Sequence, residues 1–295
     1  MNFLITGGTG FIGSALCAHL CEQGHNIVVK ARRPELLRTN MTSVRNLSEI
    51  SADINFDVVI NLAGEPIADK KWSAIQKAQI VDSRIETTEE IITYFKKTPK
   101  KPAVFISGSA IGYYGVGVSN KLIDESSVGD HSFSSRLCAQ WEACAVQAEA
   151  LGIRTCLLRI GIVLGKDGGA LNKMLLPFKL GLGGKIGSGK QWMPWIHLGD
   201  LIGIIDFCIE QTSLRGPLNC TAPNPVTNKE FSKTLGSCLR RPALLPMPAF
   251  VIKALLGDMG KELLLAGKQV CPVKLEAAGF RFKYQRLDAA LSSVL

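Results

Sequence analysis

The sequence has 295 residues, of which 46% are hydrophobic and 20% charged, a composition typical of an ordinary globular protein. No apolar run approaches the roughly 20 residues that a membrane span needs, and the first predicted strand follows Met1 without room for a signal peptide. We therefore expect no membrane partner. The net charge of +9 comes from scattered basic residues without a recognition helix or zinc pattern, so we also expect no nucleic-acid partner.

The nine cysteines form no C-x-x-C pair and lie mostly within apolar segments. Buried free thiols in a reducing compartment account for this pattern, which predicts a cytoplasmic location and gives no reason to expect a metal site.

The beginning of the chain carries its most informative motif. Residues 2–6 form an apolar run that predicts a strand, and residues 11–23 have the apolar pattern of a helix. Between them, Gly7 would supply the tight turn and Gly10 would let the backbone approach a pyrophosphate, while Gly13 would let the helix pack against the strand. A glycine-rich turn without a ligand is the alternative interpretation.

Further strands and helices alternate along the chain. Strands are predicted at residues 26–31, 57–61, 103–107 and 154–159, and helices at residues 72–97 and 132–151, with Gly152 ending the second helix. Only about 25 residues separate the second and third strands, so one strand-helix unit must be abbreviated. The alternation predicts an α/β fold with a doubly wound parallel sheet.

After Gly165 the sequence becomes rich in glycine and then in proline. We predict a dinucleotide-binding domain formed by residues 1–165 and about 196–225. Residues 166–195 and 226–295 would form a smaller, interleaved substrate region that ends in helices.

Several segments together resemble a known family. The opening Thr-Gly-Gly-Thr-Gly-Phe-Ile-Gly resembles the fingerprint of extended and atypical short-chain dehydrogenases. Other segments make the resemblance specific: residues 61–65, 83–88, 107–115, 159–165, 191–200 and 241–291. As a set they resemble the epimerase family of atypical short-chain dehydrogenases, and the tail resembles that family's C-terminal domain of unassigned function. The resemblance implies a Rossmann fold over essentially the whole chain.

The end of the second predicted strand points to NADP(H). An NAD-selective site usually has a carboxylate here, whereas this chain has Lys30, Ala31, Arg32 and Arg33. A guanidinium can bind the 2′-phosphate with two hydrogen bonds, and Arg32 is the better placed of the two arginines. Alternatively, the arginines form a solvated end of the strand.

Other cofactor contacts are predicted around the same edge of the sheet. Small residues in the turn at 61–64 would let the backbone approach the ribose, Arg84 matches a family position near the cofactor, and Ile162 could wall the nicotinamide. A surface ion pair for Arg84 and core packing for Ile162 remain alternatives. The full predicted set is Gly7, Thr9, Gly10, Phe11, Ile12, Arg32, Arg33, Leu62, Ala63, Gly64, Arg84 and Ile162.

The catalytic residues of the family are incomplete. Short-chain dehydrogenases act with a serine and a Y-x-x-x-K pair, but the family pattern places Ser134 at the tyrosine position and Cys138 at the lysine position, and no other Y-x-x-x-K occurs. Ser109 lies where the catalytic serine is expected. The nearby Tyr113 or Tyr114 could donate the proton; packing of both rings is the alternative, and a Cys138 nucleophile is disfavoured.

Two further motifs resemble functional sites but are interpreted otherwise. Residues 184–190 satisfy G-x-x-x-x-G-K, but Gln191 replaces the magnesium-binding Ser or Thr, so we predict a substrate-side loop, with Gln191, Trp192 and Trp195 as lining or core residues. His197 is predicted to be a hydrogen-bonded structural histidine, followed by Asp200 as a helix N-cap.

The main hypothesis is an NADP(H)-dependent oxidoreductase that acts on a small carbonyl or hydroxyl compound. A non-catalytic NADPH-binding sensor is the second hypothesis, favoured by the missing tyrosine and lysine, and a nucleotide-sugar epimerase-like enzyme is a third. The oligomeric state is left open.

Overall fold

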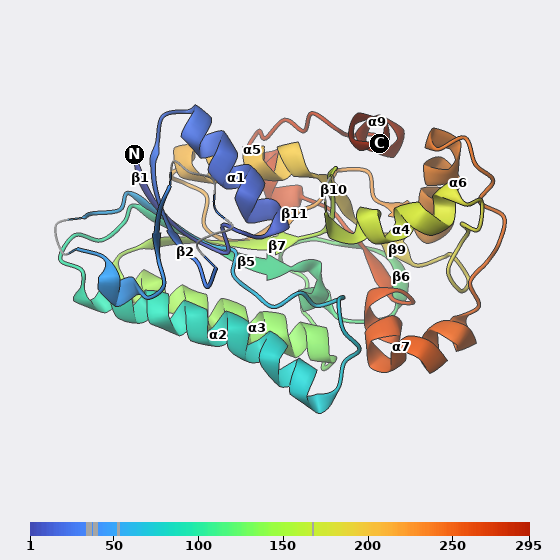
Figure 1. Ribbon diagram of the computed structural model, residues 1–295, viewed down its shortest axis with the longest axis horizontal. Coiled ribbons are helices and arrows are strands. Elements are labelled where there is room, and N and C mark those ends of the chain that lie inside the picture. The colour runs from blue at the N-terminus through green and yellow to red at the C-terminus, as the bar shows by residue number, and fades with distance from the viewer. Residues whose placement is uncertain (34–36, 38–40, 52–53, 167) are drawn as a thin grey trace.

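A seven-stranded parallel sheet organises the computed structural model (Figure 1), which describes residues 1–295 except 34–36, 38–40, 52–53 and 167. The strand order is β11-β7-β5-β4-β1-β2-β3. The strands are β1 (Asn2–Thr6), β2 (Asn26–Lys30), β3 (Thr42–Val44), β4 (Val58–Asn61), β5 (Val104–Ala110), β7 (Arg154–Ile160) and β11 (Gly216–Cys220). All six pairings are parallel, which confirms the predicted doubly wound α/β fold.

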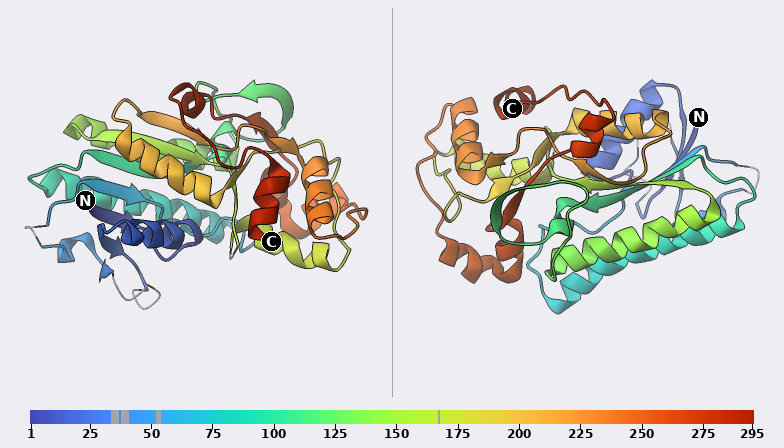
Figure 2. Two further views of the ribbon diagram at one scale, coloured as in Figure 1. Left: turned by 90° about the horizontal axis from the view of Figure 1, so that it is seen from above. Right: turned by 180° about the vertical axis from the view of Figure 1, so that it is seen from behind.

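Helices cover both faces of this sheet (Figures 1 and 2). Because side chains alternate along a strand, Phe3 and Ile5 face one core while Leu4 faces the other. The first core includes α1 (Phe11–Glu22) and α5 (Leu198–Glu210), and the second includes α2 (Ala74–Lys97) and the end of α3 (Phe133–Ala145). Both faces are therefore buried, as a parallel sheet requires.

The later part of the chain builds a separate core and three small sheets. Its helices are α4 (Gly169–Lys179), α6 (Asn228–Cys238), α7 (Ala249–Leu263), α8 (Val273–Ala277) and α9 (Leu287–Val294). The small sheets pair β8 (Ile162–Leu164) with β10 (Trp195–His197), β9 (Trp192–Met193) with β12 (Val226–Thr227), and β6 (Val118–Ile123) with β13 (Gly267–Val270). The last pairing joins the tail to a segment between β5 and α3.

The main elements agree with the sequence predictions, with shifts at their ends. The helix predicted at 72–97 begins at Ala74, because the Ser73 side chain accepts a hydrogen bond from the Gln76 amide and caps it. The helix predicted at 132–151 is α-helical only to Ala145 and continues as the 3-10 helix Val146–Leu151, which Gly152 ends in a left-handed conformation with φ 77°.

Short 3-10 helices also occur at Leu47–Glu49 and Ile111–Tyr114. In the described part of the segment between β2 and β4, the abbreviated unit contains β3 and the first of these 3-10 helices. Among the described residues, no helix has the length and apolar character needed to cross a membrane. The division into two domains stays a prediction.

Candidate functional site

The glycine turn between β1 and α1 has the geometry of a phosphate cradle. Gly7 has φ +75°, and a Cβ there would lie 2.6 Å from the Leu62 carbonyl carbon and oxygen. A Cβ at Gly13 would lie 2.1 Å from the Gly7 oxygen, so α1 can pack this closely only with glycine. Gly10 is the N-cap of α1 and has no side chain to bond the first-turn N–H groups. These groups, beside exposed Thr9, are hydrogen-bond donors at the positive end of the helix dipole, an arrangement that favours an anion.

The carboxyl ends of β1, β2 and β4 meet at this turn. The register pairs Thr6 with Lys30 on one side and with Asn61 on the other. The turn at 7–13, the residues after Lys30 and the turn after Asn61 therefore lie along one edge of the sheet, as predicted.

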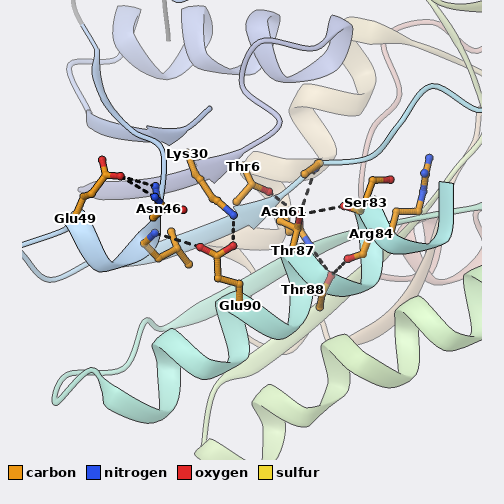
Figure 3. Close-up of polar contacts among 12 residues, drawn as sticks. Thr6, Lys30, Asn46, Glu49, Asn61, Ser83, Arg84, Thr87, Thr88 and Glu90 are labelled. Carbon is orange, nitrogen blue, oxygen red and sulfur yellow. Dashed lines mark hydrogen bonds and ion pairs between the residues drawn. The ribbon is translucent and has the colours of Figure 1, made fainter. Parts of the chain in front are cut away.

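The basic residues after β2 have different roles. Lys30 forms an ion pair with Glu90, whose other carboxylate oxygen accepts a hydrogen bond from the Leu47 amide (Figure 3). Arg32 is 85% exposed, and its Nη2 lies 3.9 Å from Glu65 Oε2. Arg33 is also exposed. The two arginines can therefore turn toward a ligand at this edge, whereas Lys30 is held by α2.

A buried hydrogen-bond network fixes the turn after β4. The Asn61 Oδ1 accepts from the Thr6 hydroxyl at 2.6 Å and from the Ala63 amide at 3.3 Å, and its Nδ2 donates to the Thr88 hydroxyl at 2.9 Å (Figure 3). Trp141 Nε1 also donates to Thr88. Leu62, Ala63 and Gly64 follow Asn61, so their backbone is held against the glycine turn.

Arg84 lies beneath this turn, on α2. Its Nη1 donates to the Glu65 and Ile80 carbonyls, and its guanidinium lies 5.3 Å from the ring centre of Trp141. A Cβ at Gly64 would lie 2.8 Å from the Arg84 Cζ, so the glycine leaves room for the guanidinium. Burial lowers the pKa of Arg84, and the nearby Glu65 carboxylate acts against this change. Arg84 is therefore a half-buried cation, bonded to two backbone carbonyls, next to the candidate cofactor edge.

Ser109 belongs to a buried polar network. Its hydroxyl donates to Glu142 Oε1 at 2.6 Å, and Glu142 forms a two-point ion pair with Arg159 at 2.8 Å for each bond. Burial alone would lower the pKa of Arg159, but the hydrogen bonds and charge of Glu142 outweigh it and raise that pKa. The sequence reasoning missed Glu142 and Arg159 as site residues, although Arg159 begins the quoted segment 159–165 and Glu142 lies in the helix predicted at 132–151.

The same network includes Tyr114. Its hydroxyl donates to Asn219 Oδ1 at 2.6 Å and accepts from Arg159 Nη1 at 2.9 Å, and its ring is buried. Burial raises the pKa of Tyr114 to about 12, although the bonds to Arg159 and Asn219 act in the other direction. This placement matches the alternative in which the ring packs, and it does not favour Tyr114 as a proton donor.

Tyr113 is placed differently. Its ring lies directly over the Arg159 guanidinium, with 3.5 Å between Cζ and the ring centre, and the side chain is only partly buried. The Tyr113 carbonyl accepts a hydrogen bond from the Ser135 hydroxyl at 2.7 Å. Within the described ranges, its phenol hydroxyl makes no hydrogen bond to protein, in contrast to the hydroxyls of Ser109 and Tyr114.

The positions of the missing tyrosine and lysine are occupied by residues with their own partners. The Ser134 amide and hydroxyl both donate to Glu262 Oε2, at 2.9 and 2.7 Å, and the Phe133 amide donates to Glu262 Oε1. Cys138 is buried, and this burial, together with the charge of Glu142, raises its pKa to about 11. A thiol in this environment is a poor nucleophile. Glu262, from α7, is a further residue that the sequence reasoning missed.

Some of the predicted substrate-side residues are partly accessible, and others are buried and support the surrounding loops. Phe11 lies against Gly165, Gly168 and Gly169, where a Cβ would come within 2.9 Å of its ring. Ile162 is half-buried and pairs with Trp195 across β8 and β10. The buried Trp195 indole donates to the Asn224 carbonyl.

Gln191 is also buried, and its Nε2 donates to the Ile186 and Leu264 carbonyls. Trp192 is half-buried, and its Nε1 donates a hydrogen bond to Asn120 Oδ1 at 3.3 Å. Gln191 and Trp195 therefore act as support, whereas Trp192 remains partly accessible. Residues 184–190 form a loop, as predicted, with a turn at 187–188 and an isolated bridge from Ile186 to Met247. No strand leads into this loop and no helix follows it directly.

His197 is a structural histidine, as predicted. It is itself the N-cap of α5: Nδ1 accepts from the Gly199 amide at 3.0 Å, and the ring lies 3.9 Å from that of Tyr284. Burial lowers its pKa. The prediction that Asp200 is the cap was wrong. Asp200 instead accepts hydrogen bonds from the Lys283 and Tyr284 amides and so holds the tail.

Comparison with known proteins agrees with this geometry. The profile of the NAD dependent epimerase/dehydratase family matches residues 3–219. The chain belongs to this family. A domain of unknown function, DUF1731, matches residues 247–294, which confirms the resemblance noted for the tail.

Relatives of similar length match the whole chain. The epimerase family protein YfhF of Bacillus subtilis is 40% identical over 300 residues, which span 100% of this chain and 98% of that protein. A crystal structure of the human epimerase family protein SDR39U1 with NADPH is 37% identical, with a TM-score of 0.91, and covers 100% of this chain and 99% of that one. A UDP-glucose 4-epimerase from Thermus thermophilus, 17% identical with a TM-score of 0.77, shares the fold.

Proposed function

We propose that the chain binds NADPH and acts as an oxidoreductase on a small carbonyl or hydroxyl compound. The observation that carries the cofactor assignment is the pair of exposed arginines beside the glycine cradle. Arg32 and Arg33 follow β2 at the position where NAD-selective sites have a carboxylate. The human relative crystallised with NADPH supports the same assignment.

The proposal assigns described residues to each part of this dinucleotide. The free N–H groups of α1 suit the pyrophosphate, because they combine hydrogen-bond donors with the positive end of the helix dipole. Arg32 and Arg33 would hold the 2′-phosphate. The backbone of Leu62–Gly64 would lie against a ribose, with the half-buried Arg84 cation behind it. Ile162 and Phe11 would wall the nicotinamide side.

Bound there, NADPH would supply the hydride for reduction of a carbonyl. We propose that Tyr113 donates the accompanying proton to the carbonyl oxygen, since its hydroxyl makes no other described bond while those of Ser109 and Tyr114 are engaged. Arg159 lies below the Tyr113 ring and would stabilise the phenolate left after transfer, because a cation attracts the electron-rich face.

The cofactor assignment is tested by affinity measurements on purified protein. Wild-type protein should bind NADPH at least about tenfold more tightly than NADH, because a charge-assisted, two-point phosphate contact contributes roughly 1.5–3 kcal/mol. Arg32→Ala should weaken NADPH binding by about that factor and leave NADH binding unchanged. Arg281→Ala, at an exposed arginine in the tail, is the matched control. Equal affinities of the wild-type protein for the two cofactors would contradict the assignment.

The proton donor is tested by turnover. With a carbonyl substrate found by screening NADPH oxidation, Tyr113→Phe should lower kcat by roughly 100-fold or more and leave NADPH affinity unchanged. Tyr94→Phe, which alters a tyrosine packed against Phe56 and Phe95, should have wild-type activity. Full activity of Tyr113→Phe would remove Tyr113 from the mechanism.

A second candidate function is a non-catalytic NADPH-binding module. The observation that favours it is the engagement of the family's catalytic positions: Ser134 bonds Glu262, and Ser109 bonds Glu142. Tight NADPH binding without turnover of any carbonyl in the screen would select this candidate. Interconversion of a nucleotide sugar without net NADPH consumption would select an epimerase-like activity instead.

A further inference from the structure

Two segments of the chain contain no acidic residue. Neither 168–199 nor 231–257 has an Asp or Glu, although the chain as a whole has 25. Their basic residues are Lys173, Lys179, Lys185, Lys190, Lys233, Arg240, Arg241 and Lys253. No acidic residue of the same segment balances these charges, although Lys173 pairs with Asp69 from outside the two segments.

The fold places the two segments side by side. The Leu245 amide donates to the Gly183 carbonyl at 3.1 Å, the Met247 amide to the Lys185 carbonyl at 2.9 Å, and the Arg241 Nε to the Lys179 carbonyl at 3.0 Å. Residues 179–185 and 241–247 thus form one ribbon. Figure 1 shows it beside α4 and leading into α7, at the end of the molecule away from β2.

Apolar side chains protrude from this ribbon into solvent. Leu244 is 82% exposed and Leu180 is 64% exposed, and Leu182 and Leu245 are exposed by more than half. We call the set the cationic apolar face; its residues are Lys179, Leu180, Leu182, Arg241, Leu244 and Leu245. Exposed Leu176 on α4 and Phe250 on α7 extend the apolar character along the chain on either side.

We propose that this face docks on the surface of an anionic lipid bilayer. A second copy of the chain would bring like charges together, which disfavours self-association. A protein partner is usually received by well-packed, partly buried pockets, whereas these leucines stand clear of the surface. Leucines that protrude beside Lys and Arg match an apolar phase with negative headgroups. The expectation of no membrane partner rested on the absence of a spanning run, and surface docking needs none.

Co-sedimentation of the full chain with vesicles tests the proposal. The protein should bind vesicles of equal parts phosphatidylcholine and phosphatidylglycerol at least about tenfold more strongly than vesicles of phosphatidylcholine alone, and less in high salt. Leu244→Ser with Leu245→Ser should weaken binding by roughly tenfold or more. Lys179→Gln with Arg241→Gln should weaken binding by a similar factor. Glutamine is chosen at position 241 because its side-chain amide can still donate a hydrogen bond to the carbonyl of residue 179.

Two control variants change the same residue types elsewhere. Val128→Ser alters an 84% exposed apolar side chain outside the face, and Lys97→Gln with Lys100→Gln removes two exposed charges from the end of α2 and the residues after it. Circular dichroism verifies that each variant is folded. Equal binding to both vesicle types, or equal loss in face and control variants, would overturn the proposal.

Two other outcomes would reassign the face. Binding to polyglutamate that the face variants lose, without vesicle binding, would assign it to an acidic protein partner. Self-association in sedimentation velocity that Leu244→Ser with Leu245→Ser abolishes would assign it to a second copy. Either result would overturn the bilayer assignment.

Discussion

At Gly7 two separate constraints act on one residue. Its φ of +75° disfavours any side chain, and the Leu62 carbonyl occupies the space that a Cβ would need. The second constraint arises from a residue 55 positions later in the chain, so the turn and the β4 loop determine each other's conformation. The cradle is therefore a property of both segments.

A matched pair of variants separates these constraints. Gly24 has nearly the same φ, +76°, with nothing within 4 Å of its Cβ position. Gly24→Ala should cost about 1 kcal/mol of unfolding free energy from the backbone conformation alone. Gly7→Ala should cost roughly 2–4 kcal/mol and also weaken NADPH binding, because the clash adds to the conformational cost.

Denaturant unfolding of both variants provides the comparison. If Gly7→Ala is no less stable than Gly24→Ala and binds NADPH normally, the close approach to Leu62 does not limit the residue at position 7.

Among the elements, α3 has an unusual N-terminus. Its own cap, Ser132, is supplemented by the Glu262 carboxylate from α7, which accepts from two first-turn amides and from the Ser134 hydroxyl. A carboxylate is favourable there because of the helix dipole. The C-terminal domain thus helps to hold the first turn of the helix at the position where the family has its tyrosine.

Removal of this carboxylate should loosen that turn. Glu262→Ala should accelerate hydrogen exchange at Phe133 and Ser134 by about fivefold, which corresponds to about 1 kcal/mol of lost capping. Asp258→Ala, on the same helix, removes an exposed carboxylate that pairs with Lys77 and Lys261, and it should leave exchange at these amides unchanged. Exchange-coupled mass spectrometry of peptides spanning α3 measures both. Similar protection in Glu262→Ala and wild-type protein would contradict a capping role.

Local patterns predicted the elements that have strong periodicity or clear end signals. The strand at 2–6 has the predicted bounds, and Gly152 ends the helical segment at the predicted residue. Strands of two or three residues, such as β9 and β3, carry too few positions for a period to appear, so pairing partners elsewhere define them. His197 was interpreted correctly but Asp200 was not, because either residue type can cap and only the tail decides which one does.

The site residues likewise divide into those that local sequence patterns predict and those that only tertiary contacts define. Gly7, Arg32 and Gly64 lie next to strand ends, so the topology of a parallel sheet is enough to bring them together. The Glu142–Arg159 pair and the Glu262 cap depend on side chains from separate elements meeting in space, and no spacing in the sequence encodes that. The engagement of Tyr114 by Asn219, 105 positions away, is likewise a tertiary property.

Over the whole molecule, the tail is attached at several separate places. β13 pairs with β6, Asp200 on α5 accepts from the Lys283 and Tyr284 amides, and α9 packs into the same core as α4 and α6. These contacts tie the residues matched by the domain of unknown function to the nucleotide-binding part. The charge is unevenly distributed over the molecule, because the two segments without Asp or Glu lie side by side at one end of it.

The pairing of β6 with β13 has a consequence during synthesis. Ile123 is aligned with Val270, about 150 residues later, and a ribosome adds roughly 5–20 residues each second. The nascent chain therefore spends on the order of 10–30 s with its glycine cradle already made but β6 without its partner strand. During that interval β6 presents an open edge to chaperones and to other nascent chains, and synthesis of the tail closes it.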